Sequence, residues 1–236
     1  MKVHNDLLGM ALNDFYTGDR KAKILVHSPD FERDEIPVSL YFREFEEMPE
    51  IEKRALNMCR DKILDAGAGA GSHSLYLQKK GMDITALDIS GGACEVMNKR
   101  GVKKIIQQDI FEYNGPKFNT LLMLMNGIGI CGNIEKLDYL LSKLPMLIER
   151  GGQFIFDSTN LIYLYQDENK LAEIDINDRY FGEIQFRLEY DDYFTPSFGW
   201  IYIDFDTLSW LVERKGMRAE KLMDGDNYHY LARILV

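Results

Sequence analysis

The chain has 236 residues, of which 46% are hydrophobic, 12% aromatic and 28% charged. This composition is typical of a globular protein and excludes disordered, collagen-like and coiled-coil chains. No uninterrupted apolar run exceeds the five residues of 121–125, far fewer than the roughly 20 that cross a bilayer. The formal net charge is −10, and no cluster of Lys and Arg offers the basic face of a nucleic-acid binder. We therefore expect neither a membrane nor a nucleic-acid partner.

Cysteine usage and the first residues both point to the cytoplasm. Cys59, Cys94 and Cys131 are odd in number and form no CxxC pair, which indicates a reducing compartment and no metal site. The opening sequence MKVHNDLLGMALNDF has early acidic residues and no continuous apolar core, so it does not resemble a secretory signal. We expect a cytoplasmic protein.

In chain order, residues 1–60 carry no strand pattern and predict a helical cap. From residue 62 onward, short apolar runs alternate with helical patterns, which is typical of βαβ units in a parallel sheet. The expected strands are 62–66, 84–88, 104–106, 120–125 and 153–157. The expected helices are 74–80, 93–100 and a third one that contains 134–144 and follows an Asn133 cap.

Beyond Asp157 the pattern changes to aromatic and acidic residues. Residues 183–190 and 199–205 predict an inserted β-hairpin, and Asp206 is expected to cap a helix that runs to Lys215. Residues 217–223 and 229–235 predict a closing antiparallel hairpin. We expect one domain, 1–236, with a cap (1–60), a core (61–157), a cap insertion (158–205) and a closing helix and hairpin (206–236).

The strongest local signal is KILDAGAGAGSHS, residues 62–74, in which a strand enters a glycine-dense loop and then a helix. Glycine lets the backbone approach a ligand closely and adopt positive φ. The third glycine comes one residue too early for the GxGxxG dinucleotide fingerprint, and the carboxylate of Asp65 would repel a phosphate. The loop therefore favours a nucleoside that carries an amino group over a diphosphate.

Two further acids lie at or just after the ends of expected strands. Asp88, 17 residues after Gly71, matches the acid that accepts ribose hydroxyls in nucleoside-binding α/β folds at a spacing of about 20 residues. Asp109 is suited to hold an adenine edge beside the apolar Ile89 and Ile110. Together these residues predict a site for a linear nucleoside ligand.

Through LDAGAGAG, ALDIS, QQDIF, LLMLMNGIG and LIERGGQFIFD, the sequence resembles the class I S-adenosylmethionine-dependent methyltransferases over about residues 55–157. The resemblance implies an α/β fold with a Rossmann-like, seven-stranded, mostly parallel sheet and an antiparallel last strand. It also implies S-adenosylmethionine as cofactor. The implied contacts are Gly67, Ala68, Gly69 and Gly71 along the methionine part, Asp65 near its amino group, Asp88 on the ribose, and Asp109 with Ile110 at the adenine.

The segment after the fourth expected strand departs from one branch of that family. DNA and RNA amino-methyltransferases have an NPPY-like motif there, whereas residues 125–129 read MNGIG. This difference argues against a nucleobase acceptor and leaves the catalytic residue unidentified. Because open α/β sheets bind ligands beyond the carboxyl ends of their strands, we expect Asn126 at the cofactor and, with Asp157, near the acceptor.

Other candidates allow two interpretations. Arg43 is assigned to the cofactor's carboxylate, because a guanidinium matches a carboxylate with two hydrogen bonds, and a surface pair with a nearby glutamate (44, 46 or 47) is the alternative. His229 is interpreted as a packed strand residue in preference to a base. The aromatic side chains of the expected hairpin are interpreted as packing in preference to a substrate cage: Tyr190, Tyr193, Phe194, Phe198, Trp200 and Tyr202.

The sequence thus predicts methyl transfer from S-adenosylmethionine to a small-molecule acceptor that is neutral or amine-bearing. The acceptor class follows from the aromatic hairpin and from residues 157–236, which carry sixteen acidic and eight basic side chains. One alternative is an NAD-dependent oxidoreductase on a similar sheet, which the GxGxG spacing and Asp65 disfavour. The other is a non-catalytic S-adenosylmethionine-binding or scaffold protein, which no sequence feature distinguishes from an enzyme.

Overall fold

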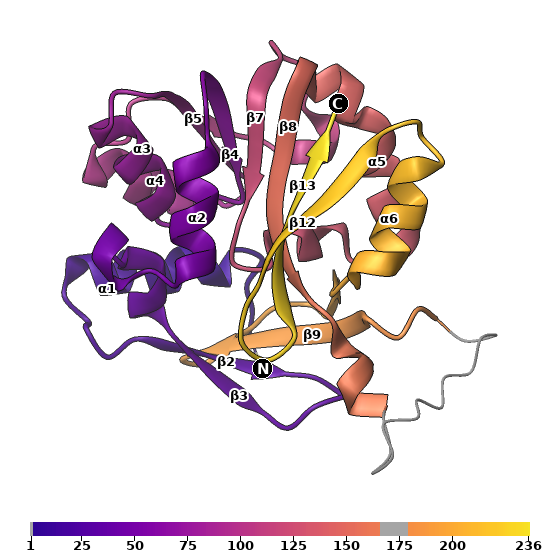
Figure 1. Ribbon diagram of the computed structural model, residues 1–236. Helices are drawn as coiled ribbons and strands as arrows, with labels where there is room; N and C mark the ends of the chain where they lie inside the picture. Colours follow the sequence, from indigo (N-terminus) through magenta and orange to yellow (C-terminus); the bar gives the residue numbers. More distant parts are fainter. Residues whose placement is uncertain (1, 166–178) are drawn as a thin grey trace.

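The computed structural model describes residues 2–165 and 179–236, and the described chain forms two sheets (Figure 1). The main sheet has seven strands in the order β12-β13-β8-β7-β4-β5-β6. Neighbours from β8 to β6 are parallel, whereas β13 runs antiparallel to both β8 and β12. The strands are β4 (Lys62–Ala66), β5 (Asp83–Asp88), β6 (Ile105–Gln107), β7 (Phe118–Met123), β8 (Ile148–Thr159), β12 (Arg218–Asp224) and β13 (His229–Leu235). The expected mixed sheet with an antiparallel last strand is confirmed.

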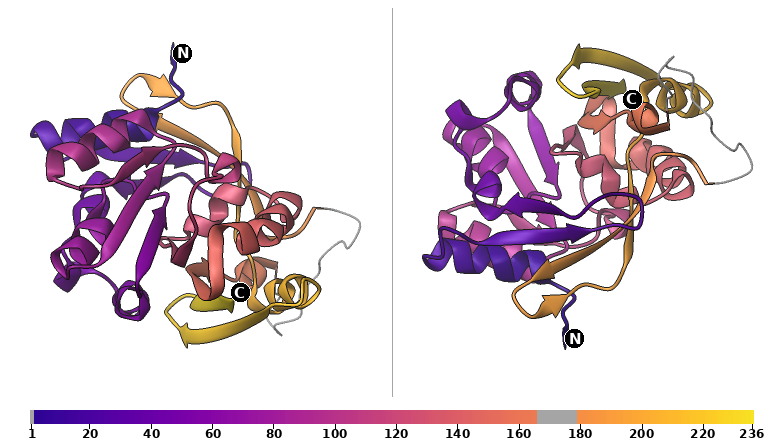
Figure 2. Two further views of the ribbon diagram at one scale, coloured as in Figure 1. Left: turned by 90° about the horizontal axis from the view of Figure 1, so that it is seen from above. Right: turned by 90° about the horizontal axis from the view of Figure 1, so that it is seen from below.

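Helices cover both faces of this sheet because its central strands are apolar on both sides (Figure 2). Ile63 and Leu122 face the side of α2 and α3, whereas Leu64 and Leu121 face α5 and α6. The helices are α1 (Leu7–Thr17), α2 (Glu50–Met58), α3 (Ser72–Lys79), α4 (Gly91–Arg100), α5 (Ile134–Leu147) and α6 (Phe205–Glu213). Alternation along β4 therefore directs Asp65 toward α3.

The side-chain caps match the sequence at one helix and differ at another. Asn133 accepts a hydrogen bond from the Lys136 N–H and caps α5, as expected. The expected cap of α6 at Asp206 is wrong, because the Asp204 carboxylate accepts the N–H groups of Asp206 and Thr207. Both aspartates suit a cap, and the structure uses the one that directly precedes the helix.

The second sheet joins the two cap segments and lies across the carboxyl ends of the parallel strands (Figure 1). Its strands are β1 (Lys2–Val3), β2 (Lys23–His27), β3 (Asp34–Pro37), β9 (Glu183–Tyr190), β10 (Tyr193–Phe194) and β11 (Phe198–Ile201). The expected hairpin of the insertion forms, since β11 pairs antiparallel with β9. Residues 166–178 of that insertion lie outside the described residues.

The N-terminal segment is helical in part, but the expectation that it lacks strands is wrong. β2 pairs with β3 and also with β9, so a hairpin of the first 40 residues extends the inserted sheet. The two strands are five and four residues long and carry charged residues, so they give little local signal. Their stabilising partner, β9, follows about 160 positions later, as in the hydrogen bond of His27 to Glu189.

Short 3₁₀-helices follow several strands. They are η1 (Val38–Phe42), η2 (Phe45–Glu47), η3 (Ile110–Glu112), η4 (Gly127–Cys131) and η5 (Leu161–Tyr165). Three of them, η3, η4 and η5, follow β6, β7 and β8, so they lie at the edge where α/β sheets bind ligands. Within the described ranges, no helix combines the length and the apolar character of a membrane span.

Candidate active site

The glycine loop between β4 and α3 contains glycines with two different roles. Gly67, Gly69 and Gly71 have φ of +75°, +55° and +80°, a region that side chains rarely adopt. A Cβ built on Gly67 would meet no atom within 4 Å, whereas one on Gly71 would lie 2.9 Å from Cγ of Met97. Gly71 therefore lets α3 pack on α4. Gly67 leaves open space where a ligand can approach the backbone.

Asp88, at the end of β5, holds this loop in place. Its Oδ2 accepts the Gly69 N–H at 2.8 Å, and its Oδ1 accepts the Ser90 N–H at 2.9 Å. Burial raises the pKa of Asp88, although these two hydrogen bonds favour the carboxylate. Because each carboxylate oxygen can accept more than one hydrogen bond, Asp88 retains capacity for a pair of ligand hydroxyls.

The next residues along the edge differ from one another in exposure. Ile89 is 68% exposed directly after Asp88 and offers an apolar surface at the strand end. Asp109 accepts the Phe111 N–H at 2.9 Å and so caps η3. The Ile110 side chain packs in the core, so a contact of this residue with an adenine would come from its backbone.

Asp65 lies beneath the loop rather than at its surface. It is 1% exposed, and its Oδ2 accepts the Ser74 hydroxyl at 2.7 Å. Burial raises the pKa of Asp65, while the nearby His73 charge and the bonds from Ser74 act in the opposite direction. Ala68 is also buried.

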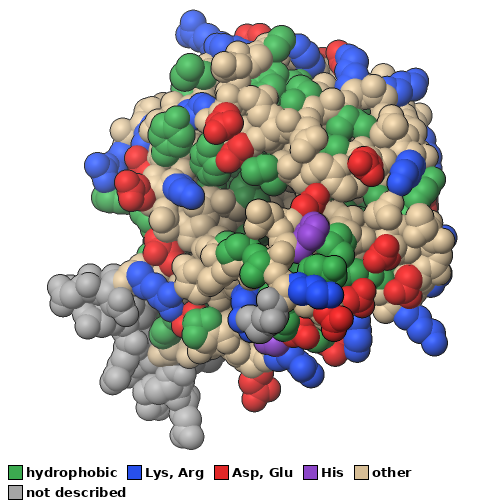
Figure 3. Space-filling view, turned by 180° about the vertical axis from the view of Figure 1, so that it is seen from behind, with side chains coloured by type: hydrophobic (Ala, Val, Ile, Leu, Met, Phe, Trp, Pro, Cys, Tyr) green, Lys and Arg blue, Asp and Glu red, His purple; other side chains and the backbone are tan. Residues whose placement is uncertain are grey.

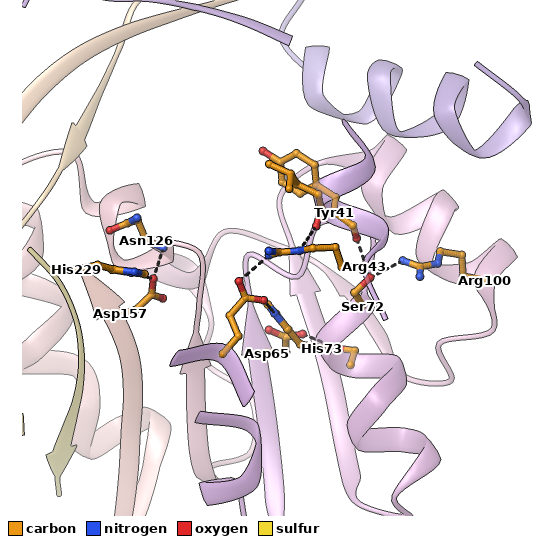
Figure 4. A network of polar contacts seen from close by, with 12 residues as sticks. Tyr41, Arg43, Asp65, Ser72, His73, Arg100, Asn126, Asp157 and His229 are labelled. Atoms are coloured by element: carbon orange, nitrogen blue, oxygen red, sulfur yellow. Dashed lines mark hydrogen bonds and ion pairs between the residues drawn. The ribbon is translucent and has the colours of Figure 1, made fainter. Parts of the chain in front are cut away.

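A buried ion-pair network connects α2 to the start of α3. The Arg43 guanidinium donates to Glu52 Oε1 at 2.6 Å, and the imidazole of His73 bonds to Glu52 Oε2 at 2.9 Å (Figure 4). The alternative of a surface pair between Arg43 and a nearby glutamate (44, 46 or 47) is wrong, because the partner is the buried Glu52.

Charge within this network is shared among buried groups. Burial lowers the pKa of His73, but the hydrogen bond to Glu52 and the charges of Asp65, Glu52 and Asp157 outweigh burial, so the net pKa lies above 6.5. Burial likewise opposes ionisation of Glu52, yet His73 and Arg43 bring its pKa below the ordinary value. The network therefore favours a glutamate carboxylate between two cations.

Glu52 was not predicted from the sequence, although one signal was present. His73 allowed two interpretations, an exposed residue of the first helical turn or a cofactor contact, and the structure has it buried. Position 52 lies on the apolar stripe of α2, which continues with residues 48, 51, 55, 56 and 59. A carboxylate within such a stripe requires a buried partner.

The 3₁₀ turn η1 covers the glycine loop. The Tyr41 ring lies 3.4 Å from the position that a Cβ of Gly69 would take, and the Tyr41 carbonyl accepts the Ser72 hydroxyl at 2.8 Å. Burial, with the charge of Asp88, raises the pKa of Tyr41 to about 12. Arg100 donates to the Ala70 carbonyl at 2.6 Å and closes the other side of the loop (Figure 4).

A second polar cluster occupies the ends of β7 and β8. Oδ2 of Asp157 accepts the Asn126 N–H at 2.9 Å and bonds to Nε2 of His229 at 2.5 Å (Figure 4). The Thr159 hydroxyl donates to the Asn126 side-chain oxygen at 3.1 Å. The interpretation of His229 as a packed strand residue is incomplete, because its side chain is 27% exposed and bound to a buried carboxylate.

The aromatic residues of the insertion pack largely against protein. Tyr190 is buried against α1 and donates to Asp14, and Trp200 lies directly against Gly129 of η4. A different aromatic pair includes Tyr228, the residue directly before His229. Tyr163 and Tyr228 stack with ring centroids 5.0 Å apart and are 38% and 53% exposed.

A seven-stranded sheet with one antiparallel strand, a glycine loop after its first strand and an acid after its second define a class I methyltransferase architecture. The chain belongs to the S-adenosylmethionine-dependent methyltransferases, a family of enzymes whose methyl donor is S-adenosylmethionine. A methyltransferase-domain family model matches residues 64–142. An S-adenosylmethionine-dependent methyltransferase from Bacteroides fragilis, solved in complex with S-adenosyl-L-homocysteine, is 40% identical with a TM-score of 0.91. That match covers 100% of this chain and 97% of the other.

More distant solved structures share the fold. The CcbJ methyltransferase from Streptomyces caelestis is 11% identical with a TM-score of 0.59, covering 81% of this chain and 94% of its own. The glycopeptide N-methyltransferase MtfA is 15% identical with a TM-score of 0.56, covering 82% and 91%. A search of curated proteins found no match.

Proposed function

We propose that this enzyme methylates a small-molecule acceptor and binds its cofactor along Gly67–Gly71, Asp88 and Ile89. The observation that carries the cofactor site is the free approach to the backbone at Gly67, next to a loop that Asp88 holds in left-handed geometry. Asp88 accepts the ribose hydroxyls, and the exposed Ile89 covers one face of the adenine. Asp109 and the Ile110 backbone meet the adenine edge, and Asn126 lies toward the methyl group.

The residues of this chain act mainly by orientation. S-adenosylmethionine supplies a methyl group that its sulfonium activates for in-line displacement. The protein holds cofactor and acceptor in line and keeps water out, which the cover formed by η1 and the second sheet supports.

Arg43 remains our candidate for the cofactor's carboxylate. Its side chain is 17% exposed and shares the buried Glu52 with His73, so two cationic groups lie near the start of α3. Asp65, beneath the loop, favours the cofactor's amino group. Arg43→Ala should weaken binding of S-adenosylhomocysteine, measured by calorimetry, and leave adenosine binding unchanged. Equal losses for both ligands would exclude the carboxylate role.

The acceptor is proposed to be neutral or amine-bearing. Support comes from the excess of acidic residues in 157–236 and from the exposed Tyr163–Tyr228 pair, because carboxylates and aromatic faces attract cations. The face drawn in Figure 3 mixes acidic and basic side chains without a continuous basic surface, which disfavours nucleic acid. The three free cysteines support a cytoplasmic location.

Two assays test the proposal. Calorimetry with S-adenosylmethionine, S-adenosylhomocysteine and NAD should give binding to the first two ligands alone. A methyl-transfer screen over amines, phenols, carboxylic acids and oligonucleotides should then give turnover on amines or phenols. Turnover confined to oligonucleotides or phosphorylated compounds would exclude the proposed acceptor class.

A further inference from the structure

The Asp157–His229 pair has the geometry of an oriented base. Asp157 is fully buried at the end of β8, and His229, the first residue of β13, keeps 27% of its side chain exposed. Because Asp157 Oδ2 bonds to Nε2 of the ring, the carboxylate favours the tautomer with the proton on Nε2. The Nδ1 lone pair is then available to a bound molecule. Carboxylates orient catalytic histidines in this way in unrelated enzymes.

Two backbone segments next to this pair have left-handed geometry, one after β7 and one before β13. Met125 and Asn126, which follow β7, have φ of +60° and +55°, and Asn227 and Tyr228, which precede His229, have φ of +53° and +60°. Large side chains rarely adopt this region, and such residues cluster at functional sites. Four of the six non-glycine residues with positive φ in the described chain therefore flank one corner of the sheet.

Asp157 also carries an unmet hydrogen-bonding capacity. Its Oδ1 is the one buried side-chain oxygen or nitrogen without a partner in residues 2–165 and 179–236. A buried carboxylate oxygen without a donor is costly. The polar group of a bound acceptor, or a water molecule, would satisfy it.

The corner lies within electrostatic reach of the cofactor loop. The charge of Asp157 is among the causes that raise the pKa of His73, and His73 is the second residue of α3, two positions after Gly71. Tyr228, the residue directly before His229, stacks on Tyr163, and both rings are partly exposed. Asn126 and His229 share Oδ2 of Asp157, so an acceptor bound beside Asn126 would lie close to the His229 ring.

We propose that His229 is the general base of the reaction and that Asp157 is its positioning residue. This inference rests on the proposed methyl transfer. The lone pair of an acceptor nitrogen or oxygen forms the bond to the methyl carbon, and the carbon–sulfur bond breaks with its electron pair left on sulfur. The acceptor's N–H or O–H proton passes to Nδ1 of His229, which later releases it to solvent. The acceptor is thus one that must lose a proton, an amine or a hydroxyl compound.

The strands that carry Asp157 and His229 do not need this hydrogen bond to stay together. β13 and β8 already form a ladder of seven residue pairs, in which His229 lies opposite Thr159. The chain also offers a matched control. His27 bonds to Glu189 at 2.6 Å with a similarly exposed ring, but this pair joins β2 to β9 in the second sheet.

The first test compares acceptors of different acidity. His229→Gln should lower kcat by about 10²–10⁴-fold for the best amine or phenol of the screen, which loses its proton during the reaction. The loss should largely disappear for 4-nitrophenol and thiophenol, which are already ionised at mildly alkaline pH. S-adenosylhomocysteine binding should not change, and His27→Gln should match wild type. If His229→Gln turns over an acceptor that must lose its proton as fast as wild type does, the proposal is overturned. If the wild type fails to bind S-adenosylhomocysteine, the proposed function itself is overturned.

The second test needs no acceptor. The chain has four histidines, so ¹⁵N-histidine spectra can be assigned with single substitutions. His229 should carry its proton on Nε2, and Asp157→Asn should change its tautomer. A proton on Nδ1 of neutral His229, or spectra unaffected by Asp157→Asn, would overturn the proposal even if every acceptor of the screen failed.

Discussion

The proposed cofactor half and the proposed acceptor half of the site are built in opposite ways. The cofactor half uses the ends of β4 and β5, and its loop and acid come from the contiguous stretch 65–89. The acceptor half gathers Asn126, which follows β7, with Asp157 of β8 and His229 of β13, and adds a sheet made of both cap segments. In this proposal a local backbone shape recognises the cofactor, whereas long-range packing shapes the part of the site that would vary with the acceptor.

The largest effect is expected where a loop glycine serves packing. Gly71→Ala should lower the free energy of unfolding by about 2–5 kcal/mol, because left-handed backbone costs about 1–2 kcal/mol and overpacking about 1–3 kcal/mol. The added Cβ would lie 2.9 Å from Met97 and 3.0 Å from Val102. In urea unfolding, Gly81→Ala is the control, since its φ is also +80° and no atom lies within 4 Å. If Gly71→Ala and Gly81→Ala lose the same unfolding free energy, the contacts of Gly71 with Met97 and Val102 contribute nothing to the effect.

A glycine that faces open space should instead affect binding. Gly67→Val should weaken S-adenosylhomocysteine binding by more than about 100-fold, or about 2.7 kcal/mol, because the side chain fills the approach to the backbone. Calorimetry measures the affinity, and circular dichroism checks the fold. Gly81→Val carries the same backbone strain at the opposite end of α3 and should bind normally. If Gly67→Val binds S-adenosylhomocysteine with wild-type affinity, the ligand does not bind at this loop.

The acid after β5 should have a smaller effect. Asp88→Ala should weaken S-adenosylhomocysteine binding by about 1–3 kcal/mol, because the ribose hydroxyls lose their charged acceptor and the Gly69 N–H loses its partner. Asp83→Ala is the matched control at the other end of the same strand, where Asp83 pairs with Lys104 at the surface. If both variants bind equally well, the ribose lies elsewhere.

The smallest expected effect is the pH dependence of stability that His73 contributes. Since the folded-state pKa of His73 lies above 6.5, its protonation adds stability that is complete below pH 6.5 and is lost as pH rises through the raised value. The difference in unfolding free energy between wild type and His73→Gln should therefore shrink as pH rises above 6.5. A difference that grows with pH would show that His73 is buried in its neutral form.

The two halves also differ in how far the sequence predicts them. Strand ends, glycine positions and Asp88 follow from local patterns with fixed spacing, and the structure has them at the expected elements. The bond between Asp157 and His229 joins residues 72 positions apart, and nothing near either residue indicates the other. The pairing of β2 with β9 depends on the same kind of distant contact, so it replaced the expected all-helical cap.

The burial of a charged residue in α2 could be predicted from the sequence, but its ion-pair partners could not. Glu52 stands on the apolar stripe of α2, and that position alone signals a paired carboxylate. Which cations pair with it depends on how α2 packs beside α3, and this packing is a tertiary property. The cap of α6 at Asp204 instead of Asp206 is a smaller case, because two equivalent acids lie within one turn.

The second sheet has a consequence for engineering acceptor specificity. β9 is hydrogen-bonded to β2 on one edge and to β11 and β10 on the other. The insertion therefore forms its sheet together with the N-terminal segment and not by itself. Exchanging residues 183–201 alone for those of a relative would give β2 a mismatched neighbour, and deleting them would leave its edge open to aggregation. A chimera should therefore take residues 2–37 and the insertion from the same parent and keep the methyl-donor core of this one.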